Sequence, residues 1–209
     1  MNIEILRERR RTIFFKILNS ESAVLKVPKR LSQKEISEFL DSKKNWLEKS
    51  VKKMKLNEDF SKQFDFQKFL YLGGKRVYNK TDIVPGFDAF EERKKMRQTK
   101  KFYQSFFPRL ENYARSISQK TGISFNDIKQ ISSVRVWGSF DSNKQMKLNF
   151  KLVILPERLV EYVIIHELCH SKQMNHSTKF WKLVEKFCPD YKERKKELNQ
   201  FGFLLKTEL

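Results

Sequence analysis

The chain contains three histidines, and their spacing restricts what the surrounding segment can fold into. His166 and His170 are four residues apart, and His176 follows six residues later, in the order H-E-x-x-H-x5-H. Residues four apart lie on the same face of a helix, one turn apart. The spacing therefore predicts a helix through His170, followed by a turn near residues 172–175 that brings His176 back towards the first two rings.

Such an arrangement is typical of a catalytic zinc site. Three neutral imidazoles are a complete set of protein ligands for a zinc ion that keeps its fourth position for water. Glu167 is rotated by about 100° from His166 around the helix, so we expect it to reach this water and not the metal. The sequence predicts a Zn2+ site held by His166, His170 and His176, with Glu167 as the general base of a hydrolase.

Two other interpretations of the histidines stay open. In the first they are ordinary polar residues on a surface helix, although the apolar stretch from Val160 to Ile165 argues against it. In the second the zinc is structural and needs a fourth protein ligand. Neither cysteine is well placed for that role, because Cys169 points about 100° away from His170. Cys188, just before Pro189, is expected in the core.

Composition indicates a well-packed protein. The 209 residues include 19 phenylalanines and only 6 glycines, which is enough apolar material for one good core. No run of about 18 apolar residues predicts a membrane span, and no signal-type apolar stretch follows Met1–Arg11. Two cysteines outside any redox or metal spacing are typical of a reducing compartment, so we expect a cytoplasmic location.

The charge balance favours anionic partners, nucleic acid first. The formal net charge is +19, from 44 Lys and Arg against 25 Asp and Glu. Local basic clusters lie at residues 7–11, 93–101 and 192–196. No nucleic-acid-binding motif accompanies them, so a solvated lysine-rich surface is the alternative interpretation.

The first half of the chain predicts strands followed by a long helix. Alternating apolar residues over 2–18 and 23–27 predict a β-hairpin or meander. Ser32 and Glu35 have the spacing of a capping box that opens a helix. The helical pattern continues to Met54, and the polar residues after it (55–67) are expected to form a connection.

A boundary between two regions is expected near residue 88. Gly73-Gly74 predicts a hairpin, and residues 79–87 are expected to form a loop. We therefore expect a β-rich N-terminal region with one long helix over 1–88 and a metal-binding region over 89–209, with one continuous domain as the alternative.

The second half predicts helices around two strands. Residues 89–121 are expected to be helical, with a break or a new start at Pro108 and an end at Gly122. Residues 127–137 and 146–155 are expected to be strands.

Helices are then expected around and after the histidines. Pro156-Glu157 opens the helix of the metal motif. Ser177 or Thr178 is expected to cap the following helix, and residues 190–200 form a last helix closed by Gly202. The fold class is therefore α+β.

Several short motifs surround the histidines between Val136 and Leu205. They are Trp137-Gly138-Ser139, Leu148-Asn149-Phe150-Lys151-Leu152, Leu155-Pro156-Glu157, Val163–His170, Met174-Asn175-His176-Ser177, Phe180-Trp181 and Cys188-Pro189-Asp190-Tyr191. With these motifs the sequence resembles the YgjP-like metallopeptidase family, which is related to the SprT-like and Wss-type proteases. The N-terminal basic hairpin and the helix to Trp46 also resemble the start of this family.

The resemblance implies a zincin-like fold, in which a small mixed β-sheet packs against an active-site helix. It also implies zinc bound by His166, His170 and His176, with Glu167 as the base. The chain departs from the family at Val136, where arginine is frequent, and at Phe140, where cysteine is frequent.

Metzincins share the histidine spacing but are excluded. The glycine of their turn is Gln173 here, and no methionine follows Met174 to form their Met-turn.

The leading hypothesis is therefore a zinc-dependent peptidase, in which Glu167 activates a metal-bound water to hydrolyse peptide bonds of a protein or peptide substrate. An extended substrate is expected along the edge of the strand at 146–152. Tyr162, Tyr191 or Arg135 is the candidate for stabilising the oxyanion. The alternatives are a nucleic-acid-associated protein, whose main role is binding or the proteolysis of nucleic-acid-bound proteins, and a zinc hydrolase of non-peptide amides.

Overall fold

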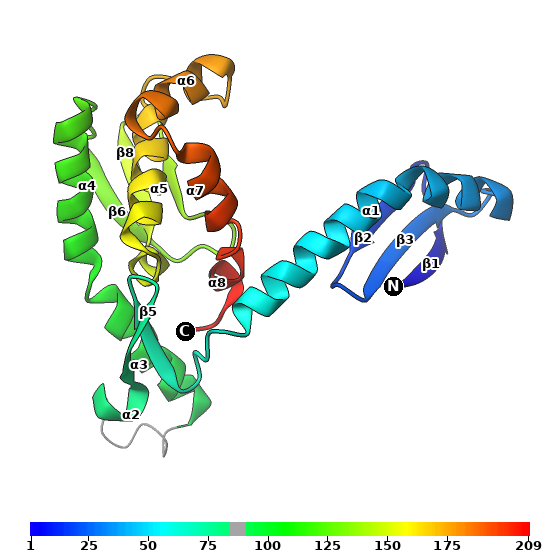
Figure 1. The fold of residues 1–209 in the computed structure, drawn as a ribbon, viewed down its shortest axis with the longest axis horizontal. Helices are drawn as coiled ribbons and strands as arrows, with labels where there is room; N and C mark the ends of the chain where they lie inside the picture. The colour runs from blue at the N-terminus through cyan, green and yellow to red at the C-terminus, as the bar shows by residue number, and fades with distance from the viewer. Residues whose placement is uncertain (84–90) are drawn as a thin grey trace. The chain divides into compact units, whose positions relative to one another are not determined.

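The computed structural model describes residues 1–83 and 91–209, without the side chain of Ile83. The chain forms two compact units, Met1–Gln63 and Phe64–Leu209 (Figure 1). The boundary expected near residue 88 falls among residues 84–90, outside the described residues, and stays a prediction. The expected α+β class is confirmed.

The N-terminal unit contains a three-stranded mixed sheet. Its strands are β1 (Asn2–Glu8), β2 (Phe14–Ile17) and β3 (Ser22–Pro28), in the order β1-β3-β2. β2 pairs antiparallel with β3, whereas β1 pairs parallel with it. The hairpin predicted over residues 2–18 and 23–27 is confirmed for β2 and β3, whereas the position of β1 is not that of a meander, because it pairs with β3 and not with β2. Alternation predicts that a segment is a strand, but packing decides which strand becomes its neighbour.

A long helix, α1 (Gln33–Ser61), covers one face of this sheet with its first turns. Ser32 caps it, and the capping box with Glu35 is confirmed. Leu25, Val27 and Ile36 form the small core between helix and sheet. The helix runs through residues 55–61, so the connection expected there is wrong, because polar helix formers are tolerated where a helix faces solvent.

The second unit begins with a hairpin of β4 (Phe69–Leu72) and β5 (Lys75–Asn79). Gly73 and Gly74 form its turn with φ of 59° and 79°, the left-handed backbone that this two-residue turn requires. The predicted hairpin is confirmed. The short helix α2 (Lys80–Ile83) replaces the start of the expected loop, and the rest of that loop, with Pro85-Gly86, lies outside the described residues.

Two helices follow where one interrupted helical stretch was predicted. They are α3 (Glu92–Gln104) and α4 (Phe107–Thr121). Pro108 lies in the first turn of α4, where its missing N–H costs no hydrogen bond. Gly122 ends α4 in the left-handed conformation, as expected.

The central sheet of this unit is small and mixed. It contains β6 (Asp127–Ile131), β7 (Gly138–Phe140) and β8 (Gln145–Asn149), in the order β6-β8-β7. β6 runs parallel and β7 antiparallel to β8. Since β8 is the central strand, the expectation that residues 146–152 offer a free edge for substrate is wrong. Within residues 1–83 and 91–209, the free edges of this sheet belong to β6 and β7.

Both predicted strands are shorter than expected, and Asn149 explains why. Its side-chain amide donates hydrogen bonds to the carbonyls of Ser133 and Val136, so residues 132–137 leave β6 and cross to β7 as an irregular loop. Its side-chain oxygen accepts from the Lys151 amide, which caps the 3-10 helix η2 (Phe150–Ile154) in place of more strand.

Lys151 ties this region to the C-terminal end of the chain. Its side chain is buried and donates hydrogen bonds to the carbonyls of Leu204, Leu205 and Thr207 at the end of α8 (Gly202–Lys206). Burial lowers the pKa of this ammonium to about 8. Gly202 begins α8, so the expectation that it closes the preceding helix is wrong.

The remaining helices are α5 (Glu157–His170), α6 (Thr178–Phe187) and α7 (Tyr191–Leu198). α5 lies beside β7 and contacts α4, α6 and α7 (Figure 1). The β-branched run Val163–Ile165 is helical, as predicted, because burial on all sides outweighs its weak helix propensity. A small mixed sheet therefore packs against this helix, which confirms the zincin-like arrangement.

Candidate metal centre

The predicted site residues come from one helix and the turn after it. His166, Glu167 and His170 lie on the last turns of α5, which ends at His170. The chain then reverses, and the side chain of Ser177 caps α6 by accepting a hydrogen bond from the Phe180 amide. This cap places His176 directly before the new helix and returns its ring to the other two.

The structure brings the three histidines to one point. Each offers a ring nitrogen, and these nitrogens all lie within 4.8 Å of one another. Nε2 of His166 and Nε2 of His176 are 3.0 Å apart. Two nitrogen ligands of a tetrahedral zinc ion, with bonds of about 2.0–2.1 Å, would lie roughly 3.3 Å apart. The donor set and its spacing therefore fit a divalent cation such as zinc.

The protonation of the rings also fits a metal site. Nδ1 of His170 is 3.1 Å from the carbonyl of Gln173, so Nδ1–H can donate there while Nε2 keeps its lone pair for a ligand. Burial, reinforced by the neighbouring His170 and His176, lowers the pKa of His166 to about 3. Burial likewise lowers the pKa of His170. Neutral imidazole is the form that binds metals.

Aromatic side chains stack on two of the three histidine rings. Trp181 stacks on His176 with ring centroids 5.6 Å apart, and Tyr191 stacks on Trp181 at 5.3 Å. Phe180 stacks on His170 at 4.6 Å. The motif Phe180-Trp181 is visible in the sequence, but the contacts of its rings with the histidines are not. The stack restrains His176, which is the exposed member of the three.

Glu167 lies in a nearly closed position between α5 and β7. Its side chain is 6% exposed, and burial raises its pKa to about 8. A Cβ atom at Gly138 would lie 2.9 Å from Cγ and 3.0 Å from Oε1 of Glu167. Any side chain at this position of β7 would therefore displace the Glu167 carboxylate, a constraint that the sequence motif Trp137-Gly138-Ser139 did not reveal.

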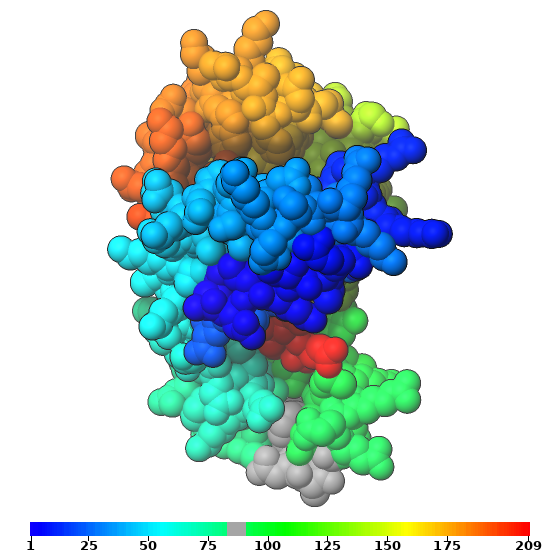
Figure 2. Space-filling model, turned by 90° about the vertical axis from the view of Figure 1, so that its right-hand side faces the viewer, coloured from blue at the N-terminus to red at the C-terminus, as the bar shows by residue number. Residues whose placement is uncertain are grey.

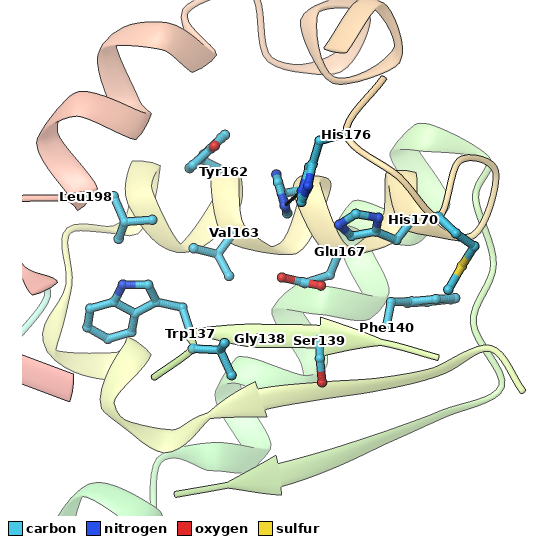
Figure 3. A pocket seen from close by; sticks show the side chains of 13 residues that line it. Trp137, Gly138, Ser139, Phe140, Tyr162, Val163, Glu167, His170, His176 and Leu198 are labelled. Carbon is cyan, nitrogen blue, oxygen red and sulfur yellow. Dashed lines mark hydrogen bonds between the residues drawn. The ribbon is translucent and has the colours of Figure 1, made fainter. Parts of the chain in front are cut away.

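A hollow of about 450 Å³ opens over these residues. Figure 3 shows Glu167 projecting towards β7, with Trp137, Val163 and Leu198 on one side and Phe140 and His170 on the other. Apart from the histidines, Glu167 and Ser139, the walls are apolar or aromatic: Val136, Trp137, Gly138, Phe140, Tyr162, Val163, Met174 and Leu198.

The cysteines take no part in this centre. Cys169 and Cys188 are both buried and free, as expected for core residues. Within residues 1–83 and 91–209, the metal-binding group consists of the three histidines without a fourth protein ligand. This argues against a closed structural zinc site, in which four protein ligands are the rule.

Comparison with known proteins identifies the family. The model of the YgjP-like metallopeptidase domain matches residues 11–201. The chain belongs to the YgjP-like metallopeptidase family. The resemblance found in the sequence is thereby confirmed, and this YgjP-like protein is a metallopeptidase, for which a divalent metal and a protein or peptide substrate follow.

No curated protein matches the chain. A similar solved structure is the metallopeptidase zymogen abylysin of Pyrococcus abyssi, at 23% identity over 43% of this chain and 90% of that one, with a TM-score of 0.39. Within the described part of this YgjP-like protein, no helix is long and apolar enough to cross a bilayer.

Proposed function

We propose that the protein is a zinc-dependent peptidase in which His166, His170 and His176 hold the zinc ion and Glu167 is the general base. The convergence of three imidazole nitrogens within 4.8 Å, on the same helical turns as a buried glutamate, carries this proposal. Three nitrogen ligands and no fourth protein ligand leave a coordination position for catalysis.

In this proposal zinc and Glu167 have different parts in the hydrolysis. Bound zinc supplies Lewis acidity, which polarises the scissile carbonyl and lowers the pKa of water towards about 7. Glu167 accepts a proton as the water oxygen adds to the carbonyl carbon. It returns this proton to the amide nitrogen as the C–N bond breaks, so the peptide is hydrolysed and Glu167 is regenerated.

The free edge of β7 is the proposed binding place for an extended substrate. β7 pairs with β8 on one side only, and all three of its residues line the hollow. A peptide in extended conformation can pair with such an edge. Of the three candidates for the oxyanion, Tyr162 lines the hollow, whereas Arg135 and Tyr191 are not among its lining residues.

The walls of the hollow favour uncharged side chains next to the cleaved bond. Trp137, Val163 and Leu198 form an apolar wall beside Glu167 (Figure 3). A charged substrate side chain placed there would lose its hydration without gaining a partner. We therefore expect substrates with aliphatic or aromatic residues at this position.

The Glu167→Gln variant tests the assignment of the base. It should retain zinc and lose at least about 10³-fold of its turnover, since amide nitrogen and oxygen cannot take up the proton. Metal content is measured by mass spectrometry, and turnover with casein and quenched fluorescent peptides. Undiminished hydrolysis would exclude Glu167 as the base.

Two further variants complete this test. His176→Ala should lose both zinc and turnover, which separates metal binding from proton transfer. Glu185→Gln, on the exposed side of α6, is the matched control and should change neither. Restoration of the chelator-treated protein by zinc, compared with manganese and cobalt, identifies the metal that supports turnover.

A further inference from the structure

A second hollow lies in the N-terminal unit, where β1 and β3 end. It measures about 500 Å³, and five of its seven lining residues are cationic. The lining residues are Glu8, Arg9, Arg10, Arg11, Pro28, Lys29 and Arg30. They come from two segments about twenty residues apart in the chain, so the fold and not the sequence alone gathers this charge.

The one acidic residue of this hollow already has partners. Nζ of Lys26 is 2.7 Å from a carboxylate oxygen of Glu8, and the Arg10 guanidinium is 3.8 Å from the other. Nε of Arg10 also donates to the carbonyl of Thr12. Glu8 therefore cannot neutralise the remaining cations of the hollow.

Three of those cations have no partner among the described residues. Arg9, Arg11 and Lys29 are exposed, and none of them forms an ion pair or a side-chain hydrogen bond within residues 1–83 and 91–209. Arg30 lines the hollow beside them. Like charges held this close repel one another, and an anion would remove that repulsion.

The backbone that carries these cations is tied in place. The Arg7 guanidinium donates to the carbonyls of Lys29 and Leu31, and the amides of Arg10 and Lys29 both donate to the carbonyl of Glu8. The two lining segments are thus joined by hydrogen bonds. In the space-filling view the dark-blue end of β1 stands out from the surface beside the light-blue start of α1 (Figure 2).

We propose that this hollow binds the phosphodiester backbone of a nucleic acid. Guanidinium groups bind phosphate through two parallel hydrogen bonds, and regularly repeated phosphates match several neighbouring cations. Phe14, which is 44% exposed, lies next to the hollow with the Arg10 guanidinium 5.5 Å from its ring centroid. An exposed aromatic ring beside a basic groove is a stacking surface for a base of a single strand.

This binding function is separate from peptide hydrolysis and does not depend on the proposed role of Glu167. The test is fluorescence anisotropy of the full chain with a labelled single-stranded oligonucleotide of about 20 nucleotides, over a series of salt concentrations. The triple variant Arg9→Ala, Arg11→Ala, Lys29→Ala should bind at least about tenfold more weakly at low salt. The slope of log affinity against log salt should fall by roughly 2 to 3.

A charge-matched control distinguishes this site from the general positive charge. The variant Lys49→Ala, Lys52→Ala, Lys53→Ala removes three exposed lysines of α1 and should change the affinity less than about twofold. Phe14→Ala should weaken binding of the single strand without changing the salt slope. Peptide hydrolysis by the triple arginine and lysine variant should equal that of the wild type.

Three results would overturn the proposal. The first is a wild-type protein that does not retain the oligonucleotide even at low salt. The second is an equal loss of affinity in the α1 control, which would assign binding to diffuse charge. The third is competition by polyglutamate as effective as that by the unlabelled oligonucleotide at equal charge, which would assign the hollow to acidic proteins.

Discussion

The two compact units use their polar residues in opposite ways. In Phe64–Leu209 the polar groups of interest are buried, and Asn149, Lys151 and Glu167 are exposed by 0%, 6% and 6%. In Met1–Gln63 the charged residues stand at the surface, and the 29 residues of α1 contribute one buried residue, Ile36. The second unit therefore buries polar side chains in its core, whereas the N-terminal unit has a small core and carries its charged side chains on the surface.

This contrast is consistent with the two functions proposed above. Burial raises the pKa of Glu167 and lowers the pKa of His166 and His170, and this burial comes from the core of the second unit. Attraction of an anion needs exposed cations, and a small core is enough to hold them together.

We expect the greatest change in stability from a substitution in the small core of the N-terminal unit. Ile36→Ala removes the buried contact of α1 with Leu25 and Val27, and should lower the free energy of unfolding of the N-terminal unit by about 2–5 kcal/mol. Hydrogen exchange of the β3 amides measures this loss. Hydrolysis of short peptides should be unchanged, and an equal fall in hydrolysis would show that the two units are not separate in function.

Gly138→Ala tests whether the position of the Glu167 carboxylate depends on the close approach of β7. The added methyl group would lie 2.9 Å from Cγ of Glu167, so the carboxylate must move. A displacement of this size should lower kcat/KM by about 10²-fold while zinc stays bound. Gly202→Ala, where nothing lies within 4 Å, is the control and should leave kcat/KM unchanged. Equal activity of the two variants would contradict the close approach of β7 to Glu167.

Trp181→Leu tests the support of the exposed ligand. Without the stacked indole, His176 loses its restraint, and the affinity for zinc should fall by about tenfold. Competition with a chromogenic chelator measures this affinity. Trp46→Leu, which removes a 48% exposed tryptophan of α1, should have no effect on it. If both variants bind zinc like the wild type, the stack does not position His176.

We expect the smallest change in stability from an ion pair at the surface of the second unit, Phe64–Leu209. Arg194 donates a hydrogen bond to Asp190 and lowers the pKa of that carboxyl below 3.8. The pair should contribute about 0.5–1 kcal/mol above pH 4, and this contribution should be lost as the pH falls through the lowered pKa. Asp190→Asn and the wild type should therefore differ in denaturant unfolding at pH 7, and the difference should shrink steadily as the pH falls below 4. A difference that does not shrink over this acid range would point to another cause.

Local signals in the sequence predicted their structures correctly. The capping box of Ser32 and Glu35, the turn at Gly73-Gly74, the start of α4 at Pro108 and the end at Gly122 all depend on hydrogen bonds or backbone angles within a few residues. The histidine motif belongs to the same class, since the helical repeat and one turn bring its rings together. This is why the candidate site could be proposed before the fold was known.

Errors arose where distant segments meet. The alternation within residues 2–18 identified strands but not the parallel pairing of β1 with β3. Residues 146–152 were expected at an edge, and β8 is central because β6 and β7 both pair with it. Strand propensity does not encode the neighbour of a strand, which is chosen by the packing of side chains from remote parts of the chain.

The family, the α+β class and the four residues proposed for catalysis could be predicted from the amino-acid sequence, because motif spacing and helical periodicity are local properties. Three features became visible only in the folded chain: β7 is the edge beside Glu167, Gly138 leaves room for that carboxylate, and Trp181 stacks on His176. The folded chain also brings two short basic segments to one hollow. These features depend on burial and on close approach between separate segments, and their free energies exist only once the chain has packed.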